Sequence, residues 1–326
     1  MASFTIRRLL ASIPVLLLSS MLVFAMVANS GDPLGELRSR NPPVPAHVIE
    51  ARRHQLQLDR SLPERYWEWM RHFVRGDMGQ SITGLEVQPL LVRRMATTLR
   101  MVLLAIVLAA LLAVGSGVLS AVRQYTPSDY LLTFAGFLFL SMPTFWLAAV
   151  LKEFGAIRLN QLLGRQWIFV VGAESPNLAG PLGHRLADYA GHLFLPTLAI
   201  ALTYFASWSR FQRAATLEVL GSDYLRMAKA KGLARWRVTV LHALRTSLAP
   251  LVTVMAIDAA GILGGVIVVE QVFSWHGMGE LFVQGVQTSD MNIVLACLMV
   301  SSGFVVLFNL AADILYAVLD PRVRDE

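Results

Sequence analysis

The chain has 326 residues, of which 55% are hydrophobic and only 15% are charged, and its formal net charge is +6. Soluble domains carry about 25% charged residues, so this composition, with apolar runs near the ~20 residues that cross a bilayer, excludes an ordinary soluble protein. The runs lack the alternation of barrel strands, which predicts an all-α integral membrane protein. Its basic residues are spread over loops between the runs, so a positive-inside bias explains the charge better than a nucleic-acid partner does.

Six membrane-spanning helices are expected, at about residues 9–29, 98–122, 130–151, 191–211, 248–270 and 292–318. The first of them follows Arg7 and Arg8 and is similar to a secretory signal peptide. Its apolar stretch is longer than the roughly 7–15 residues of a signal-peptide core, and more spans follow, so we interpret it as a retained span. The single cysteine, Cys297, excludes an intrachain disulfide.

The long segment 30–97 is predicted to form a helical subdomain inserted between the first two spans. Proline and glycine punctuate its start, and apolar residues then recur at helical spacing from Tyr66 to Val74. Trp67 and Trp69 lie in this stretch and are candidates for contact with a partner protein. An aromatic belt at the membrane interface accounts for the two tryptophans equally well.

The orientation follows from the charges of the shorter loops. The connection 212–247 carries seven Lys and Arg residues against two acidic ones, whereas the connection Gln271 to Met291 carries no Lys or Arg. Positive loops stay in the cytoplasm, so we expect 212–247 and both termini inside. The insertion 30–97 then lies outside, since long loops translocate largely regardless of charge.

The loop 212–247 is predicted to hold a helix, a turn and a second helix. Leu217, Leu220, Tyr224 and Met227 recur every three or four residues, which favours one amphipathic helix over 216–231. Gly232 suits the left-handed end of that helix. A second short helix is expected over 234–246, with one face formed by Trp236, Val240, Leu241 and Leu244.

This helix–glycine–helix segment is interpreted as a docking element for a cytoplasmic protein. Two of the three lysines of the chain, Lys229 and Lys231, stand beside the small residues Ala228 and Ala230 at its tip. An anchor to anionic lipids is the alternative, because basic residues next to headgroups contribute about 1 kcal/mol each. A lipid anchor requires neither a glycine at a fixed place nor a tip of alanines.

Asp258 is the most conspicuous polar residue inside a predicted span. An ionised Asp at a helix centre costs roughly 2.5–3.5 kcal/mol, and such residues usually face a bundle interior or a wet cavity. Asp258 either lines a translocation path or is a hydrogen-bonded carboxyl that ties spans together. Glu270 and Trp275, at the end of the same span, are further candidates for the path.

Several motif-bearing enzyme classes are excluded. A P-loop needs a Gly-Lys pair to hold phosphates, and none of the three lysines follows a glycine. No histidine is followed by the glutamate of a zinc-protease helix, and no Gly-x-Ser-x-Gly elbow occurs. We therefore expect a chain that is not an enzyme and that holds no cofactor or metal.

The loop resembles the coupling motif of permease subunits in bacterial ABC importers of the dipeptide/oligopeptide/nickel group. Arg226 to Ala228 stand at the family's glutamate-alanine-alanine positions, Gly232 at its glycine, and His242 to Arg245 at its isoleucine-x-leucine-proline positions. The glutamate and proline of the general motif are absent, but the residues present match the peptide-importer form. The resemblance implies that the following residues contact an ATPase: Arg226, Ala228, Lys229, Ala230, Lys231, Gly232, His242 and Arg245.

Other segments resemble the same group in the same order along nearly the whole chain. They are Gly31-Asp32-Pro33, Leu58 to Pro63, Arg75 to Ser81, Ser141 to Trp146, Val269 to Trp275 with Gly277 to Gly279, and Leu319 to Arg322. Residues 27–30 depart from the pattern, where many relatives have an arginine and a proline. In this family an external insertion contacts the substrate-binding protein. The segment 30–97 corresponds to that insertion.

The resemblance implies a type I ABC importer permease in a bacterial inner membrane. Its parts would be a first span at 1–29, the insertion at 30–97 and a five-span core at 98–326 that includes the coupling loop 212–247. The implied partners are a second, similar permease, two ATPase subunits that hold ATP and Mg²⁺, an external substrate-binding protein and the lipid bilayer. The alternative is an ATP-independent secondary transporter or channel, which predicts inverted repeats or broken midplane helices; no convincing repeat is visible.

Overall fold

The computed structural model describes residues 2–32, 34–39, 43–176 and 180–319. Within them the secondary structure is helical apart from an isolated bridge between Gln80 and Glu86. Five helices are long and apolar enough to cross a membrane, and a bent pair of helices adds a sixth candidate. The prediction of an all-α membrane protein is confirmed, with five to six candidate spans against the six expected. Pro33 and residues 320–322, which belong to two of the family-like motifs, lie outside the described residues.

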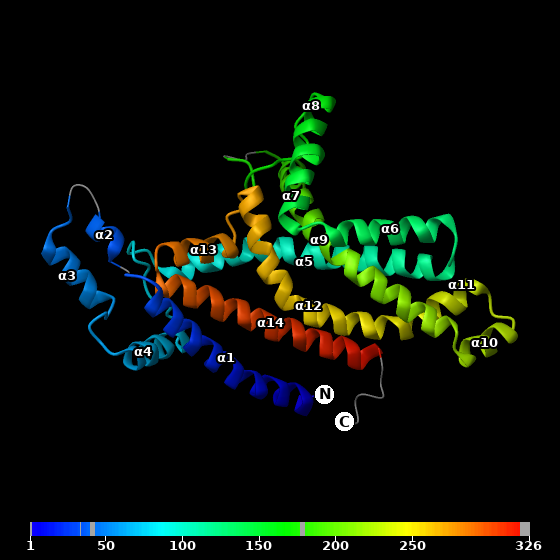
Figure 1. Ribbon diagram of the computed structural model, residues 1–326, viewed down its shortest axis with the longest axis horizontal. Helices are drawn as coiled ribbons and strands as arrows, with labels where there is room; N and C mark the ends of the chain where they lie inside the picture. The colour runs from blue at the N-terminus through cyan, green and yellow to red at the C-terminus, as the bar shows by residue number, and fades with distance from the viewer. Residues whose placement is uncertain (1, 33, 40–42, 177–179, 320–326) are drawn as a thin grey trace. The chain divides into compact units, whose positions relative to one another are not determined.

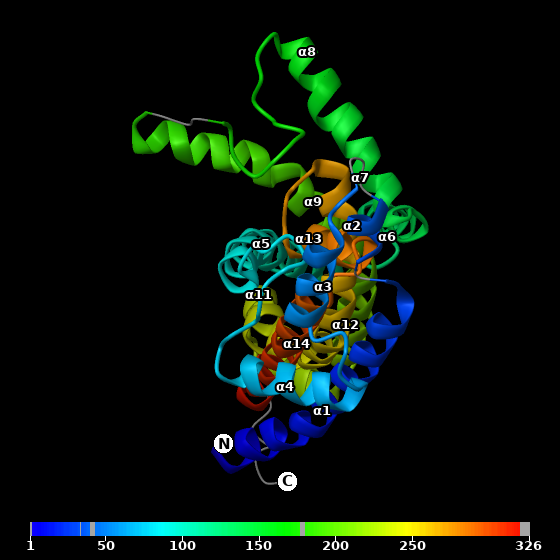
Figure 2. The ribbon, with the colours of Figure 1, turned by 90° about the vertical axis from the view of Figure 1, so that its left-hand side faces the viewer.

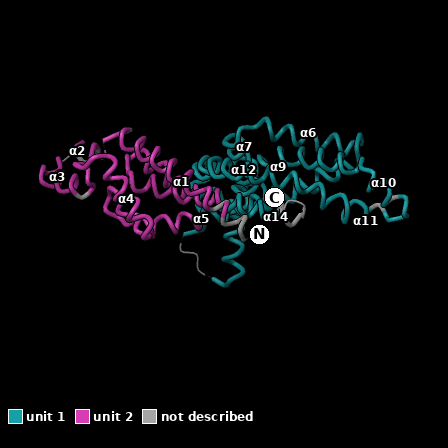
Figure 3. The backbone as a smooth tube through the Cα atoms, turned by 90° about the horizontal axis from the view of Figure 1, so that it is seen from below, with its two compact units in different colours: residues 1, 98–276, 307–326 teal, residues 2–97, 277–306 magenta. Residues whose placement is uncertain are grey.

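The chain divides into two compact units, each built from separated stretches of sequence (Figure 3). One unit comprises Ala2–Thr97 and Gly277–Val306, and we call it the insertion unit. The other comprises Thr98–His276 with the chain from Leu307 onward, and we call it the core unit. The division at Thr97 falls where the sequence places the start of the core, but residues 277–306 group with the insertion.

The insertion unit holds the first helix, the helices of the insertion, and the starts of two long helices. In chain order they are α1 (Ala2–Ser30), α2 (Gly35–Ser39), α3 (Ala46–Gln55), α4 (Leu62–Val74), the start of α5 (Val87–Val122), α13 (Met278–Gln287) and the start of α14 (Met291–Leu319). The stretch from Tyr66 to Val74 is helical, as its spacing predicts. The Glu64 carboxylate accepts a hydrogen bond from the Ser61 amide at 3.2 Å and caps α4.

Helix α4 is held against α1 by aromatic packing. Trp69 and Met70 are buried together with Phe24 of α1, and the Tyr66 hydroxyl lies 2.8 Å from the Ser20 hydroxyl. The Trp69 ring stacks on Phe73 at a centroid distance of 5.1 Å. The insertion therefore packs on a membrane helix of its own unit instead of forming a separate globule.

The core unit holds the remaining helices. They are most of α5, α6 (Pro127–Ser141), α7 (Thr144–Lys152), the π-helical turn η1 (Glu153–Arg158), α8 (Leu159–Leu163), α9 (Leu182–Leu220), α10 (Asp223–Ala230), α11 (Arg235–Arg237), the π-helical turn η2 (Val238–Ala243), α12 (Leu244–Phe273) and the end of α14. Helices α9 and α12 lie side by side (Figure 1). The side chains of Trp208, Phe273 and Trp275 are buried in the core that these helices share.

The third predicted span is broken, so a continuous helix over 130–151 is wrong. Helix α6 ends at Ser141, α7 begins at Thr144, and the two are bent by 106° (Figure 1). Pro143 causes the break, because proline lacks an amide hydrogen and drives the residue before it out of the helical region. Met142 accordingly has an extended backbone, with φ −89° and ψ 123°. Figure 2 shows the irregular segment 164–176 that follows α8.

Candidate functional site

The segment expected to couple the chain to an ATPase forms a hairpin of α10, a turn, α11 and η2, and we call residues 223–243 the coupling hairpin. The single helix predicted over 216–231 is wrong, since α9 ends at Leu220 and α10 begins at Asp223. The Ser222 hydroxyl donates to the Val219 carbonyl at 2.5 Å, which terminates α9 before the chain turns.

Gly232 adopts the left-handed conformation that the sequence predicts, with φ at +79°. The Lys231 amide donates to Met227 at 3.0 Å and the Leu233 amide to Ala228 at 3.4 Å, which satisfies carbonyls at the end of α10. A Cβ added at Gly232 would meet no heavy atom within 4 Å. The backbone conformation, and not lack of space, therefore calls for glycine.

The second half of the hairpin continues directly into a membrane helix. The separate helix predicted over 234–246 is wrong, because α11, η2 and α12 follow one another without a break. Its apolar side chains face outward, with Trp236, Val240 and Leu241 exposed by 61%, 51% and 57%. A small inner cluster of Leu225, Val238 and Ala243 closes the hairpin. The Arg237 guanidinium lies 5.4 Å from the Trp236 ring centroid, and the apolar face is otherwise open to solvent.

The predicted coupling residues are mostly at the surface of this hairpin. Ala230, Lys231, Gly232, His242 and Arg245 are exposed, and Ala228 is half-buried. Arg226 pairs with Asp223 at 3.4 Å, and both side chains are largely exposed. The side chain of Lys229 lies outside what the structure describes. The hairpin therefore presents cations around an apolar face, which suits a protein groove lined by acidic and apolar groups.

Below the hairpin, a buried ion pair joins three helices. Arg213 of α9 donates to Asp129 of α6 at 3.0 Å, and Ser120 of α5 also donates to that carboxylate. The Tyr125 amide donates to the second carboxylate oxygen at 2.9 Å. In the sequence Arg213 is one of the seven cations of the connection 212–247. No local signal indicates its partner Asp129, which is 84 residues away.

A second buried polar group ties α9 to α12 near the same end. The Gln212 amide nitrogen donates to the Thr216 hydroxyl at 3.0 Å and to the Ser247 hydroxyl at 2.9 Å. All three side chains are fully buried. Together with the Arg213 pair, these contacts tie the end of α9, which leads into the hairpin, to α12, α5 and α6.

Asp258 is hydrogen-bonded across a helix pair. The indole nitrogen of Trp208, a fully buried residue of α9, donates to its carboxylate at 2.7 Å. The prediction of a carboxyl that ties two spans together is confirmed, while its role in a translocation path stays a prediction. Tyr204 lies one turn from Trp208 on the same helix, with the two rings 5.7 Å apart.

Glu270 and Trp275, the other two candidates for the path, are buried inside the core unit. Thr98 donates to the Glu270 carboxylate at 2.5 Å, and the Trp275 amide donates to the Glu270 carbonyl at 2.9 Å. Their side chains are 0% and 2% exposed. The Lys152 ammonium donates to the Val272 carbonyl at 2.7 Å, at the end of α12, where a cation is favoured.

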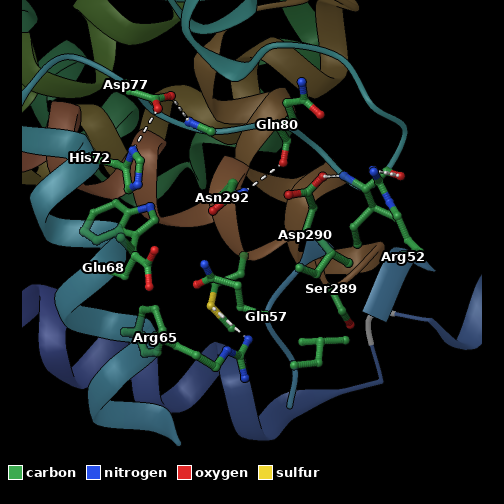
Figure 4. A pocket seen from close by; sticks show the side chains of 17 residues that line it. Arg52, Gln57, Arg65, Glu68, His72, Asp77, Gln80, Ser289, Asp290 and Asn292 are labelled. Atoms are coloured by element: carbon green, nitrogen blue, oxygen red, sulfur yellow. Dashed lines mark hydrogen bonds and ion pairs between the residues drawn. The ribbon is translucent and has the colours of Figure 1, made fainter. Parts of the chain in front are cut away.

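The insertion unit contains a pocket of about 350 Å³ beside α4 (Figure 4). Trp67 is 63% exposed, whereas Trp69 is 9% exposed and lines this pocket. Figure 4 shows Arg65 and Gln57 on one side of the pocket and Asp77 and Gln80 on the other. The sequence offered no signal for the pocket, because its walls come from α1, α3, α4 and the start of α14.

Two carboxylates of the pocket wall have opposite shifts in pKa. The Gly79 amide, which donates to Asp77 at 2.9 Å, lowers the pKa of that carboxyl, and His72 acts in the same direction. Burial raises the pKa of Asp290, even though its carboxylate accepts a hydrogen bond from the Ile82 amide at 2.6 Å. Asp290 holds Ile82 of the loop 77–82 next to the start of α14, whereas Asp77 joins the same loop to His72 of α4.

Comparison with known families matches both parts of the chain. Residues 113–325 match the model of the "Binding-protein-dependent transport system inner membrane component", and residues 1–101 match the model of that component's N-terminal part. The chain belongs to this family. The match confirms the resemblance noted from the motifs, and it covers almost the whole length of the protein.

Several permeases are similar to this family member from end to end. The oligopeptide transport system permease protein OppB of Mycobacterium tuberculosis (strain ATCC 25618 / H37Rv) is 43% identical over 324 residues, 99% of each chain. AppB of Bacillus subtilis (strain 168), also an oligopeptide transport system permease protein, is 36% identical over 99% of this chain and 100% of its own. The glutathione transport system permease protein GsiC of Escherichia coli O6:H1 is 33% identical over 99% of each.

These matches decide the class of the protein. It is a multi-pass permease subunit of a binding-protein-dependent ABC importer in the bacterial inner membrane. The prediction that the chain translocates a solute and is not an enzyme is confirmed. The ATP-independent transporter or channel is not favoured, since these relatives are transport-system permeases and the chain matches the binding-protein-dependent family.

Proposed function

We propose that this permease imports peptides, pairs with a second permease, and is driven by two ATPase subunits that hold ATP and Mg²⁺. The observation that carries the proposal is the coupling hairpin, with its exposed cations, its outward apolar face and its left-handed Gly232. The oligopeptide permeases among the relatives support peptides as the solute.

The hairpin docks in a groove of an ATPase subunit. Trp236, Val240 and Leu241 are exposed by half or more and supply apolar contacts. Arg226, Lys231 and Arg245 surround them and steer the approach of an acidic rim. When the ATPases close on ATP, the hairpin moves with them, and the buried contacts of Gln212 and Arg213 pass the movement to α9, α12, α5 and α6. The membrane helices then switch as packed bodies between two states.

Solute reaches the path from a binding protein on the outer side. Trp67, exposed on α4, is the candidate contact for that protein, and Trp69 contributes from the pocket wall behind it. Asp258, bonded to Trp208 where α9 meets α12, lines the path, while Glu270 and Trp275 support the end of α12 from inside.

Purification of the importer from its own bacterium tests the proposal. Affinity-tagged chain should retain an ATP-hydrolysing partner and a second permease in mild detergent, and proteoliposomes of that complex should take up peptide only with binding protein and ATP. A chain that never retains an ATPase, or uptake that proceeds without ATP, would contradict it.

A further inference from the structure

The pocket beside α4 has a positive charge that the described part of the protein does not compensate. The Arg65 guanidinium contacts the Met291 sulfur at 3.6 Å and lies 5.9 Å from the Phe24 ring centroid. A thioether sulfur is a weak acceptor, and burial lowers the pKa of Arg65. Among the residues that the structure describes, Arg65 has no carboxylate partner, so the pocket wall calls for an anion.

The other charged groups on the wall are already paired. Glu68 pairs with Arg60, and Asp77 with His72 at 2.9 Å. Arg52 donates to the Ser81 carbonyl at 2.6 Å, and Asp290 accepts from Ile82. Each of these groups has a hydrogen-bond partner within the insertion unit. Arg65 differs from them, because its only polar contact among the described residues is the Met291 sulfur.

A second donor in the same place is also unsatisfied. Trp69 is 9% exposed, and its indole nitrogen is buried with no acceptor among the described residues. It stands four positions after Arg65, so the two side chains share one face of α4. A buried N–H without a partner is costly, and a single oxyanion would satisfy both groups.

Two left-handed helix ends border the pocket. Gln57, at φ 52°, and Ser289, at φ 53°, follow the ends of α3 and α13. The Leu58 amide donates to the Arg53 carbonyl at 3.1 Å and the Asp290 amide to the Gly285 carbonyl at 2.8 Å, which are the hydrogen bonds that close a helix C-terminus. These caps fix the backbone that carries Gln57 and Ser289 at the pocket wall.

The rest of the lining suits a short peptide. The primary amides of Gln57, Gln80 and Asn292 offer donors and acceptors for peptide groups, and Phe24, Leu56 and Leu58 form an apolar wall. The volume of about 350 Å³ lies at the lower end of the roughly 300–1,000 Å³ typical of small-molecule sites. A lipid phosphate would satisfy Arg65 but would make no use of the amides.

We propose that this pocket binds the carboxy-terminal end of a peptide, with Arg65 pairing with the carboxylate and Trp69 Nε1 donating to it. A guanidinium fork matches both oxygens of a carboxylate. The inference rests on the proposed function, since it takes the solute to be a peptide. The site gives the permease its own peptide contact, separate from the external binding protein.

Direct binding to the purified importer, without its binding protein, tests the site. A fluorescent tripeptide with a free carboxy terminus is compared with its carboxamide in neutral-lipid nanodiscs. Because a hydrogen bond to a charged group is worth about ten- to a hundredfold in affinity, the carboxylate form should bind tighter by that factor. Arg65→Gln should remove the preference, Arg65→Lys should keep part of it, and Arg71→Gln, an exposed arginine of the same helix, should leave it intact.

Four outcomes overturn the site. In the first, the wild-type importer binds the carboxylate and carboxamide forms equally. In the second, Arg65→Gln keeps the preference for the carboxylate. In the third, phosphatidylglycerol nanodiscs abolish peptide binding, and Arg65→Gln changes only the binding of that lipid. Loss of binding-protein association in Arg65→Gln with unchanged peptide binding would also overturn it. ATP-driven peptide uptake by the wild-type importer is measured in parallel, so absence of uptake identifies failure of the proposed function instead.

Discussion

At the scale of single residues, the permease is held together by polar side chains that find partners far away in sequence. Asp258 meets Trp208 across 50 positions, and Arg213 meets Asp129 across 84. Inside a membrane such groups are costly when unpaired, so each pair fixes the register of its helices. The sequence identifies Asp258 as an unusual carboxylate inside a span, but only the fold shows that Trp208 is its partner.

Replacing Asp258 separates its structural role from its role in the path. Asp258→Leu leaves the buried Trp208 N–H without an acceptor, which should destabilise the protein by about 1–3 kcal/mol. Asp258→Asn keeps an acceptor oxygen, so its unfolding temperature in detergent should stay near that of the wild type while peptide uptake falls. Full uptake by Asp258→Asn would show that the charge has no role in translocation.

Breaking the buried pair beneath the hairpin should be far more harmful than breaking an exposed one. Asp129→Ala leaves Arg213 without its counter-ion, and because Arg213 is 30% exposed the loss should lie near the lower end of the range for buried pairs, about 3 kcal/mol. Asp223→Asn, which removes the exposed pair to Arg226, is the matched control and should cost less than 1 kcal/mol. Equal unfolding temperatures for the two variants would contradict this.

At the scale of elements, local rules predicted some features of the permease and missed others for identifiable reasons. The left-handed Gly232 followed from its place after an amphipathic run. The breaks at Gly221 and Pro143 were missed, although proline signals one of them, because the apolar pattern continues across both. The pocket beside α4 was beyond sequence reasoning, since its walls come from four helices that only tertiary packing brings together.

A substitution at Gly232 should uncouple ATP hydrolysis from uptake. Gly232→Val forces a β-branched residue into φ +79°, which distorts the hairpin tip although no atom blocks the side chain. The variant should insert in the membrane and assemble more weakly with the ATPase, and peptide uptake should be lost. Uptake per ATP hydrolysed, measured in proteoliposomes, is the readout.

Gly84 provides the matched control for that substitution. Its φ is +87°, and a Cβ there also meets nothing within 4 Å, but it lies in the insertion. Gly84→Val should impose comparable backbone strain without changing uptake per ATP. Uncoupling by both variants would trace the effect to general destabilisation, and normal coupling in Gly232→Val would remove the hairpin from the coupling step.

At the scale of the whole molecule, the loop charges predict that the insertion and the coupling hairpin lie on opposite sides of the membrane. The native chain suits a test with thiols, since its single cysteine, Cys297, is buried. Trp67→Cys and Trp236→Cys introduce thiols at two positions of nearly equal exposure, 63% and 61%. A membrane-impermeant maleimide should label Trp67→Cys in intact spheroplasts and Trp236→Cys only after permeabilisation. The wild-type chain is the background control, and labelling of both variants from the same side would overturn the orientation together with the docking of the hairpin on a cytoplasmic ATPase.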